Sequence, residues 1–570
     1  MQAARATAIV DAGAIAERLR VGLGLTRTVA DVLAARGHVD VERTRAFLDP
    51  RLADLTPPEA MLDRERAAER LARAVRGRER VVVFGDYDVD GITSCAVLTS
   101  ALRAFGGEVV TLLASRFDGG YGFSARALER ALAASPAVIV TCDCGSSDHP
   151  RLAEAAARGV DVLVIDHHLV PAAPLPAHAF LNPHRPECGF PFKHLASCGL
   201  ALSVAAAVRA KLGVALDLRP LLDLVALGTV ADVASLVGDN RALVRAGLHR
   251  VATSPRPGIE ALAEVAGIAP GVAISGEDIA FKLAPRINAP GRLGAPDLAL
   301  ELLLAETVVE ARALAARVEQ DCKTRREIER RLTAEALAQV ESTGQGDAPA
   351  IVVAGQGWHV GVVGIVAARL VDAFGVPTVV IALDGAEGRG SVRGPSGSRL
   401  HDALTRSSTA LLGFGGHQAA AGVHVASDSV ERLRASFREA CAAQAGGDGE
   451  RSDVRRTRVA PRWDARLDPH DDPHAVVVDL ERLEPCGEGN VAPLLSVADV
   501  EVVSVRVMKD EHLRLVVRHG GRLLDAFGYG LGSVAPARGA IVELHGRLRR
   551  DTYRGRGAVE LRLTAVVGRP

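Results

Sequence analysis

Three short runs rich in β-branched residues, each followed by an acidic side chain, constrain the fold of this chain more than any other feature. The runs are Val81–Phe84, Ala137–Thr141 and Val162–Ile165, and the acids that follow them are Asp86, Asp143 and Asp166. Each run is too short for a helix and is typical of a buried strand in a parallel sheet. Because ligands bind at the carboxyl ends of such strands, we expect these acids to gather at one edge.

The wider pattern predicts an α/β protein with a doubly wound parallel sheet, because strands and helical stretches alternate between residues 80 and 248. With 570 residues, the chain has room for roughly three to five domains. The predicted segments are an N-terminal helical region (1–77), the parallel-sheet domain (78–297), a long connecting helix (298–346), a second, smaller α/β domain (347–446) and a C-terminal OB-like β-barrel (457–570). Two details follow: Pro285–Pro296 should be a loop, and one helix should run from Leu298 to Ser342.

Composition excludes several classes of protein. The 68 basic and 69 acidic residues give a net charge of -1, so any contact with nucleic acid needs local basic patches. The eight cysteines form no paired CxxC framework, which suits a reducing compartment. The chain shows neither a signal peptide nor an apolar run long enough to span a bilayer, so we expect a cytoplasmic protein with no membrane contact.

A set of carboxylates and one imidazole has the composition of a metal centre. Its members are Asp88, Asp90, Asp143, His167 and Asp232, which come from four separate segments. Carboxylates favour hard divalent cations, and the imidazole shifts the preference from Ca²⁺ toward Mn²⁺ or Mg²⁺. A single Asp after a strand is more often a helix cap or turn former, but the joint occurrence at three strand ends favours two bound metal ions.

The same segments resemble the four motifs of the DHH phosphoesterase superfamily, and most closely those of the RecJ family of single-strand-specific exonucleases. The segments are Gly85–Gly91, Asp143–Gly145, Asp166–His168 and Gly228–Asp232. The resemblance implies that the five residues above bind two divalent metals and that His168 contacts the scissile phosphate and takes part in catalysis. It also gives Asp86 and Asp166 supporting roles in which they orient the ligands.

The resemblance further implies a function: 5′-to-3′ degradation of single-stranded DNA to mononucleotides, in DNA repair and recombination. A single-strand-binding protein and a helicase are candidate partners, and we expect a monomer. Two alternatives stay open. One is a DHH phosphodiesterase of short oligonucleotides or cyclic dinucleotides, although neither substrate needs a barrel. The other is a non-catalytic strand-binding replication scaffold, although the intact ligand set argues against it.

Residues in Gly- and Pro-rich segments are candidates for binding the phosphate groups of the strand, because a guanidinium can bind two oxygens and glycine lets the backbone approach closely. They are Arg116, Arg286, Asn288, Arg292, Ser391, Arg393, Gly416 and His417. The segment Gly413–Gly422 is expected to form a turn that enters a helix, and its Gly-Gly-His sequence resembles the DHH-associated domain. Taken alone, each arginine is more often a solvated or ion-paired surface residue. In the barrel, arginines between Arg547 and Arg556, with Tyr553 among them, suit single-strand binding.

Overall fold

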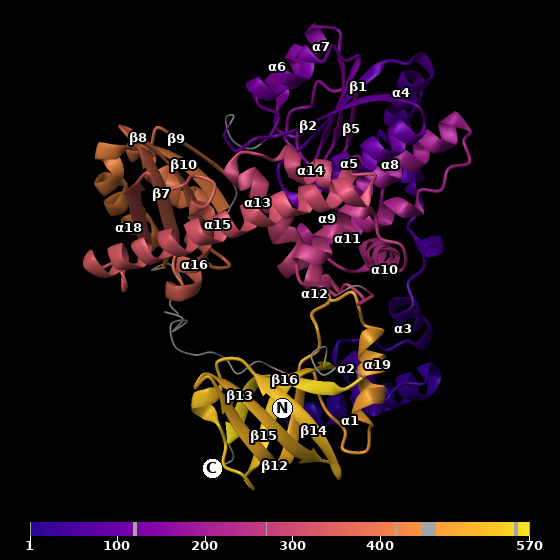
Figure 1. Ribbon diagram of the computed structural model, residues 1–570, viewed down its shortest axis with the longest axis vertical. Helices are drawn as coiled ribbons and strands as arrows, with labels where there is room; N and C mark the ends of the chain where they lie inside the picture. Colours follow the sequence, from indigo (N-terminus) through magenta and orange to yellow (C-terminus); the bar gives the residue numbers. More distant parts are fainter. Residues whose placement is uncertain are drawn as a thin grey trace.

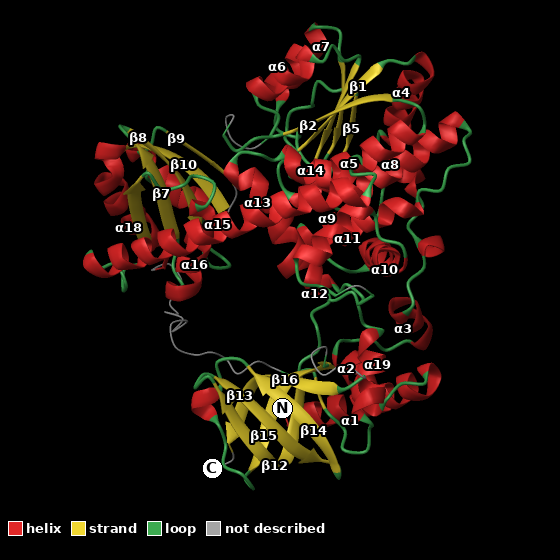
Figure 2. Cartoon of the chain, in the orientation of Figure 1, coloured by secondary structure: helices red, strands yellow, loops and turns green. Residues whose placement is uncertain are grey.

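The computed structural model describes residues 2–117, 122–269, 271–416, 420–445, 463–551 and 557–568. Strands gather in three separate groups, and helices fill the space between the first two (Figure 2). The parallel-sheet domain, the second α/β domain and the barrel form three bodies, and one long helix runs from the first body to the second (Figure 1). No helix among these residues is long and apolar enough to cross a membrane. The cytoplasmic location and the monomeric state stay predictions.

The first sheet is entirely parallel, as predicted. Its strands are β1 (Arg80–Gly85), β2 (Glu108–Leu113), β3 (Val138–Cys142), β4 (Asp161–Ile165) and β5 (Ala179–Leu181), in the order β2-β1-β3-β4-β5. The three strands that precede the acids are therefore neighbours, and parallel pairing brings their carboxyl ends to one edge.

Both faces of this sheet are buried, because side chains alternate along each strand. Val81 and Val83 pack against helices α4 (Arg64–Gly77), α5 (Val89–Ala104) and α8 (Ser197–Leu212). Val82 and Phe84 pack on the other side, against α6 (Ala125–Ala133) and α7 (His149–Ala157). Burial on two faces explains why the strands read as continuous apolar runs.

A layer of helices follows the first sheet, and two expectations for it were wrong. Its members are α9 (Leu222–Ala231), α10 (Gly238–Thr253), α11 (Pro257–Val265), α12 (Gly276–Asp278), the π-helix η4 (Ile279–Leu283), α13 (Ala284–Leu293), α14 (Asp297–Leu304) and α15 (Val308–Ser342). The segment Pro285–Pro296, expected as a loop, is mostly helix α13, because Pro285 lies in the first turn, where its missing N–H is not needed. The helix expected from Leu298 to Ser342 is two helices, because Thr307 caps α15 by accepting from the backbone N–H of Glu310.

The second α/β domain has a mixed five-stranded sheet. Its strands are β6 (Ile351–Gln356), β7 (Thr378–Asp384), β8 (Glu387–Arg393), β9 (Gly413–Gly416) and β10 (Ala420–Ala426), in the order β6-β7-β8-β10-β9. Helices α16 (Val363–Phe374), α17 (Leu400–Arg406) and α18 (Val430–Ala445) accompany the sheet. The Gly413–Gly416 segment was expected to be a turn that enters a helix, but it is an edge strand, because its backbone pairs with β10.

Helix α15 belongs to two hydrophobic cores. Its first half contributes Leu314 and Val318 to the core of the parallel-sheet domain. Its second half contributes Leu332 and Val340 to the core between α16 and the second sheet. The helix is thus a continuous part of both domains, as the long connecting element in the predicted fold requires.

The C-terminal domain is a closed barrel, as predicted. Its strands are β11 (Ala465–Arg466), β12 (Leu495–Met508), β13 (His512–His519), β14 (Arg522–Gly528), β15 (Ile541–Arg550) and β16 (Val559–Gly568), and β12 closes the ring by pairing with β15. The barrel core also includes residues of α1 (Gln2–Leu23), α2 (Arg27–Ala35), α3 (Val41–Leu48) and α19 (Pro473–Glu481). The predicted N-terminal region is therefore shared: its first three helices pack with the barrel, whereas α4 packs on the first sheet.

A buried arginine joins the barrel unit to the parallel-sheet domain. Arg241 of α10 is only 2% exposed, and its guanidinium lies 4.0 Å from the ring centroid of Phe47. It donates to the carbonyl oxygens of Phe47 at 2.7 Å and Leu483 at 2.9 Å. Because one side chain satisfies carbonyls from both ends of the chain, it fixes how the two units meet.

Candidate functional site

Four segments bring their polar side chains to the carboxyl edge of the first sheet. Asp86 follows β1, Asp143 follows β3 and the triplet Asp166–His168 follows β4. Asp88 caps helix α5 by accepting from the backbone N–H of Gly91 at 3.1 Å. Asp232 lies at the C-terminal end of α9, so this fourth contribution comes from a helix end.

The imidazole of His167 lies at the centre of this carboxylate cluster. Its Nε2 atom is 3.3 Å from Oδ1 of Asp143, 3.7 Å from Oδ2 of Asp232 and 4.0 Å from Oδ2 of Asp90. Nε2 is buried and has no hydrogen-bond partner among the described residues. Because buried ring nitrogens are normally paired, an unpaired one that faces three carboxylates fits a cation.

The cluster divides into overlapping sets of ligand atoms. One set joins Asp90, His167 and Asp232, a second joins Asp86, Asp88 and Asp143, and within each set the atoms lie within 4.8 Å of one another. A further set includes His168 with Asp143 and His167. Because Asp143 and His167 each occur in two sets, the arrangement fits two adjacent divalent cations that share ligands.

The electrostatics of the cluster also favour cations. Burial raises the pKa of Asp143 well above its usual range, and the charges of Asp88 and Asp90 raise it further. Burial likewise raises the pKa of Asp232 to about 8, with a further contribution from Asp90. Carboxylates packed this closely repel one another, so bound cations would stabilise their ionised form.

His168 has different surroundings from His167. Its Nδ1 lies 2.7 Å from Oδ1 of Asp166, and Asp166 also accepts from the backbone N–H groups of Ser146, His167 and His168. Burial alone would lower the pKa of His168, but the hydrogen bond to Asp166 and the charge of that residue raise it to about 9. The hydrogen bond to Asp166 thus favours the protonated imidazole, the form suited to a phosphate oxygen.

Two residues that are not among the predicted site residues support the cluster. The backbone N–H of Ser197, at the start of α8, donates to Oδ2 of Asp90 at 2.7 Å, and its hydroxyl donates to Oδ1 of Asp143 at 3.0 Å. Asn182 donates from Nδ2 to the carbonyl oxygen of His168 at 2.8 Å. Of these two contacts, only that of Ser197 had a signal in the sequence, namely the start of a helix, because helix N-termini favour a nearby negative charge.

Three arginines from different elements form a cationic cluster, defined here as Arg116, Arg292 and Arg393. The guanidinium of Arg116 lies 3.7 Å from the ring centroid of Tyr87, and Nη1 of Arg292 donates to the carbonyl oxygen of Gly361 at 3.1 Å. Burial lowers the pKa of Arg292 to about 9, and the charges of Arg116 and Arg393 contribute to that shift. Like charges held this close favour an anion between them.

The cationic cluster continues to the start of helix α16. A Cβ atom added to Gly364 would lie 3.1 Å from Oγ of Ser391 and 3.3 Å from Nη2 of Arg393. Both side chains therefore lie against the first turn of the helix, where backbone N–H groups carry partial positive charge. A hydroxyl, a guanidinium and a helix N-terminus together suit a phosphate group.

Comparisons with known proteins agree with this geometry. The sequence matches the DHH family, N-terminal domain, over residues 80–229, the DHHA1 domain over 347–443 and the RecJ OB domain over 463–565. It is 36% identical over 521 residues to the single-stranded-DNA-specific exonuclease RecJ of Dickeya dadantii, covering 87% of this chain and 88% of that protein. This chain belongs to the RecJ family.

Other RecJ proteins extend the match. RecJ of Bacillus subtilis is 34% identical over 517 residues, which cover 90% of this chain but 64% of that protein. The chain thus spans less than two thirds of the length of this RecJ protein. The crystal structure of RecJ from Thermus thermophilus in complex with Mn²⁺ has a TM-score of 0.80 at 30% identity, covering 98% of this chain and 78% of that one. A Mg²⁺ complex of the same protein has a TM-score of 0.72 at 28% identity.

The structure gives less support to the other residues predicted to bind phosphate in this RecJ-family chain. Arg286 is buried between α13 and α15, where Nε donates to Glu319 at 2.6 Å and Nη1 donates to the carbonyl oxygen of Lys282, so its charge is already matched. The Oδ1 atom of Asn288 is buried without a hydrogen-bond partner among the described residues. Gly416 ends strand β9, and His417 lies outside the described residues, as do Tyr553, Arg554 and Arg556.

The outer face of the RecJ OB domain carries a row of cationic side chains. Cross-strand pairing sets side by side Arg547, Arg562, Phe527, Arg514 and Arg506, which are defined here as the arginine row. These residues alternate with buried ones such as Leu513 and Leu515, so they point away from the core. Among the described residues, three of them have no carboxylate partner: Arg506, Arg514 and Arg547. Beside the row, Tyr529 packs edge-on against Phe527, and the guanidinium of Arg562 lies over both rings.

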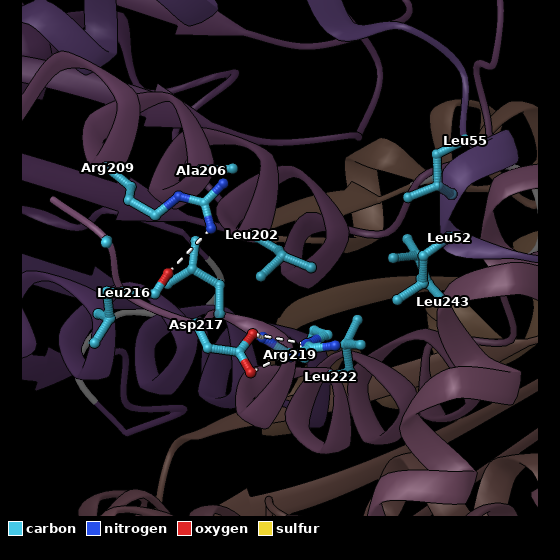
Figure 3. A pocket seen from close by; sticks show the side chains of 12 residues that line it. Leu52, Leu55, Leu202, Ala206, Arg209, Leu216, Asp217, Arg219, Leu222 and Leu243 are labelled. Atoms are coloured by element: carbon cyan, nitrogen blue, oxygen red, sulfur yellow. Dashed lines mark hydrogen bonds and ion pairs between the residues drawn. The ribbon is translucent and has the colours of Figure 1, made fainter. Parts of the chain in front are cut away.

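A separate apolar groove of about 590 Å³ is lined by residues of α8, α9 and α10 and of the segment between α8 and α9 (Figure 3). Its lining includes Leu52, Leu202, Leu222 and Leu243, together with Arg209, whose Nη1 donates to the carbonyl oxygen of Leu216 at 3.0 Å. None of the residues that line this groove belongs to the carboxylate or cationic cluster. The groove is therefore separate from the polar groups that converge at the strand ends.

Proposed function

We propose that this chain is a single-stranded-DNA-specific exonuclease that hydrolyses phosphodiester bonds with two divalent metal ions and releases mononucleotides in the 5′-to-3′ direction. The observation that carries the proposal is the carboxylate cluster around the unpaired Nε2 of His167 in a chain that also holds a cationic cluster. Relatives named single-stranded-DNA-specific exonuclease RecJ support the choice of substrate. A role in DNA repair and recombination, with a single-strand-binding protein and a helicase as partners, is part of the proposal.

The proposed metal ligands are Asp88, Asp90, Asp143, His167 and Asp232, and the ions are Mn²⁺ or Mg²⁺. Solved RecJ structures with either ion support this choice. When bound, such ions lower the pKa of water and neutralise charge on phosphoryl oxygens. The chain itself holds the ligands in place: two N–H groups of α8, from Ser197 and Cys198, donate to the carboxylate of Asp90.

His168 is proposed to donate a hydrogen bond to an oxygen of the scissile phosphate. Asp166 holds the imidazole at 2.7 Å and keeps it protonated, because it raises the pKa of the imidazole. A cationic donor strengthens its hydrogen bond as negative charge develops on the phosphate in the transition state. Asp86 is proposed to orient Asp88, because ligand atoms of both belong to one set with Asp143.

The cationic cluster is proposed to bind the phosphate at the 5′ end of the strand. Arg116, Arg292, Arg393 and Ser391 supply donors from three elements that meet beside the carboxylate cluster. Binding of the end phosphate beside the hydrolytic groups would account for exonucleolytic cleavage, since it sets the terminal nucleotide at the reacting position. Farther along the strand, the arginine row and its aromatic neighbours would bind backbone and bases.

A length series of 5′-labelled single strands, assayed with Mn²⁺, tests this proposal. We expect release of labelled mononucleotides, with kcat/KM rising as the strand grows long enough to reach the barrel. A strand annealed to its complement is the matched control and should be degraded far more slowly. Equal turnover of dinucleotides and long strands would instead favour a phosphodiesterase of short oligonucleotides, and no turnover of any substrate would favour a strand-binding scaffold.

A further inference from the structure

Three exposed apolar side chains each follow directly after a residue of the site. Leu169 follows His168 and is 72% exposed, Val233 follows Asp232 and is 64% exposed, and Phe117 follows Arg116 and is 41% exposed. Single exposed apolar residues are common on protein surfaces, but three beside one polar site form a local pattern. We call Leu169, Val233 and Phe117 the apolar rim.

The backbone of Val233 is strained. Its φ of 59° lies in the left-handed region, which a β-branched residue rarely adopts. Val233 follows the last turn of α9, a position that glycine normally occupies, and its N–H donates to the carbonyl oxygen of Val230. With its side chain mostly in solvent, the valine gains little inside the protein that would offset this strain. Strained residues cluster at functional sites, which suggests a contact with something outside the chain.

Leu169 is held on a fixed backbone beside the cluster. Asn182 donates to the carbonyl oxygen of His168, the group directly before Leu169. Consecutive Cα atoms are about 3.8 Å apart. Nε2 of His167 lies 3.7 Å from Oδ2 of Asp232 within the carboxylate cluster. Leu169 is two residues after His167, and Val233 is one residue after Asp232, so both lie close to this contact. Phe117 lies on the side of the cationic cluster, and its ring meets that of His359 edge-on at 6.1 Å.

A nucleotide matches this combination of surfaces. Its phosphate is anionic and suits the polar cluster, whereas its base has a flat face of low polarity that suits an apolar side chain. In a duplex, both faces of a base are covered by stacked neighbours and its edge is paired, so the base cannot turn toward the rim. Contacts to base faces also tolerate any sequence, because every base has such a face.

We propose that Leu169 and Val233 contact the faces of the unpaired bases next to the bond that is cut, and so act as specificity-determining residues for single strands. The inference rests on the proposed function, since it concerns the strand held at the same site. Phe117 belongs to the same surface on the side of the 5′ end.

The test combines a protein change with a substrate change. Leu169→Ser is assayed on a single strand with normal bases and on the same strand with abasic residues at its first two positions. On the normal strand we expect kcat/KM to fall roughly tenfold, as for loss of one apolar contact. On the abasic strand, the variant and the unchanged protein should differ by less than about twofold, because the base that the leucine contacts is missing.

Val233→Gly gives an independent signature. Glycine adopts the left-handed conformation without strain, so we expect the Tm to rise while kcat/KM on the normal strand falls. Val309→Ser is the matched control, because Val309 is 82% exposed on α15 and belongs to neither cluster nor to the rim. The control should leave kcat/KM unchanged on both strands.

Specific outcomes overturn the inference. An equal loss for Leu169→Ser on normal and abasic strands would mean that the side chain supports the cluster and not the base. Unchanged kcat/KM on the normal strand for both rim variants would also overturn it, as would a lower Tm for Val233→Gly. Absence of turnover by the unchanged protein would instead contradict the proposed function, so the two failures are distinguishable.

Discussion

The two α/β domains are built from similar layers but present opposite charge. In the parallel-sheet domain, carboxylates follow directly after adjacent strands, so they meet at one buried edge. In the second domain, Ser391 and Arg393 lie near the end of strand β8, against the start of helix α16. In the proposed function, the first site needs added cations before it can hold a phosphate, whereas the cationic side chains of the second suit an anion directly. Because Arg116 and Arg292 of the parallel-sheet domain complete the cationic cluster with Arg393, the comparison teaches that the proposed phosphate site needs both domains, whereas the carboxylate cluster needs only the first.

The largest expected effect comes from Asp143→Ala, which removes a carboxylate that belongs to two sets of ligand atoms. Hydrolysis should fall by at least about a thousandfold, because a shared ligand of both cations is lost. Strand binding, measured by fluorescence anisotropy without metal, should change little, since the variant keeps the cationic cluster. A variant that binds weakly but turns over normally would contradict the division of roles between the carboxylate cluster and the cationic cluster.

Gly361→Ala tests how closely helix α13 and the second α/β domain must approach each other. A Cβ atom at this position would lie 2.1 Å from the backbone oxygen of Arg292, so α13 and the second domain would have to move apart. A displacement of about 1 Å at a reacting site can cost about a hundredfold in kcat/KM, which is the loss we expect. Gly413→Ala is the control, because nothing lies within 4 Å of its added Cβ. Equal activity of both variants would show that the approach is not needed.

Arg393→Ala should act on binding more than on chemistry. Loss of one charge-assisted contact to phosphate should raise KM about thirtyfold and leave kcat within about threefold. A 5′-hydroxyl strand should lose less than a 5′-phosphate strand if the arginine binds the end. Arg389→Ala, on the exposed part of the same strand, is the control. A fall in kcat with constant KM would place Arg393 with the hydrolytic groups instead.

The smallest effect is expected for Arg514→Ala in the arginine row. Long strands should bind about threefold more weakly, and the slope of log affinity against log salt should become shallower by about 0.7. Short strands should be unaffected, because they do not reach the barrel. Arg518→Ala on the same strand is the control, since Arg518 is already paired with Glu501. Equal slopes of log affinity against log salt for Arg514→Ala and the unchanged protein would show that the arginine row does not contact the strand.

Local patterns in the sequence predicted the carboxylate cluster, because each acid directly follows the apolar run that positions it. Contacts between residues that are far apart in the sequence could not be predicted from such local patterns. Ser197 reaches Asp90 only through the packing of α8 on α5, and Arg286 meets Glu319 only because α13 lies against α15. The prediction of a loop at Pro285–Pro296 was wrong for a related reason. It rested only on the proline and glycine content of the segment, whereas the preceding π-helix leads the chain directly into α13.

The predicted domain boundaries also did not anticipate that the N-terminal helices pack against the C-terminal barrel. The N-terminal helices have an ordinary apolar pattern that says nothing about their partner, and their partner is the barrel more than four hundred residues later. Cross-strand neighbours in the arginine row are likewise invisible in sequence, because they depend on the register of five strands. Residue types therefore predicted well which side chains gather at the strand ends, and predicted the cross-strand neighbours of the barrel less well.

The shared core of the N-terminal helices and the barrel has a consequence for synthesis on the ribosome. Leu33 and Leu495 are both fully buried in that core, yet about 460 residues separate them. At roughly 5–20 residues per second, the helices wait on the order of half a minute or longer before their partner emerges. During that time their apolar faces are open to water and to other nascent chains. These helices are thus covered only when the barrel strands have been made, long after the helices themselves.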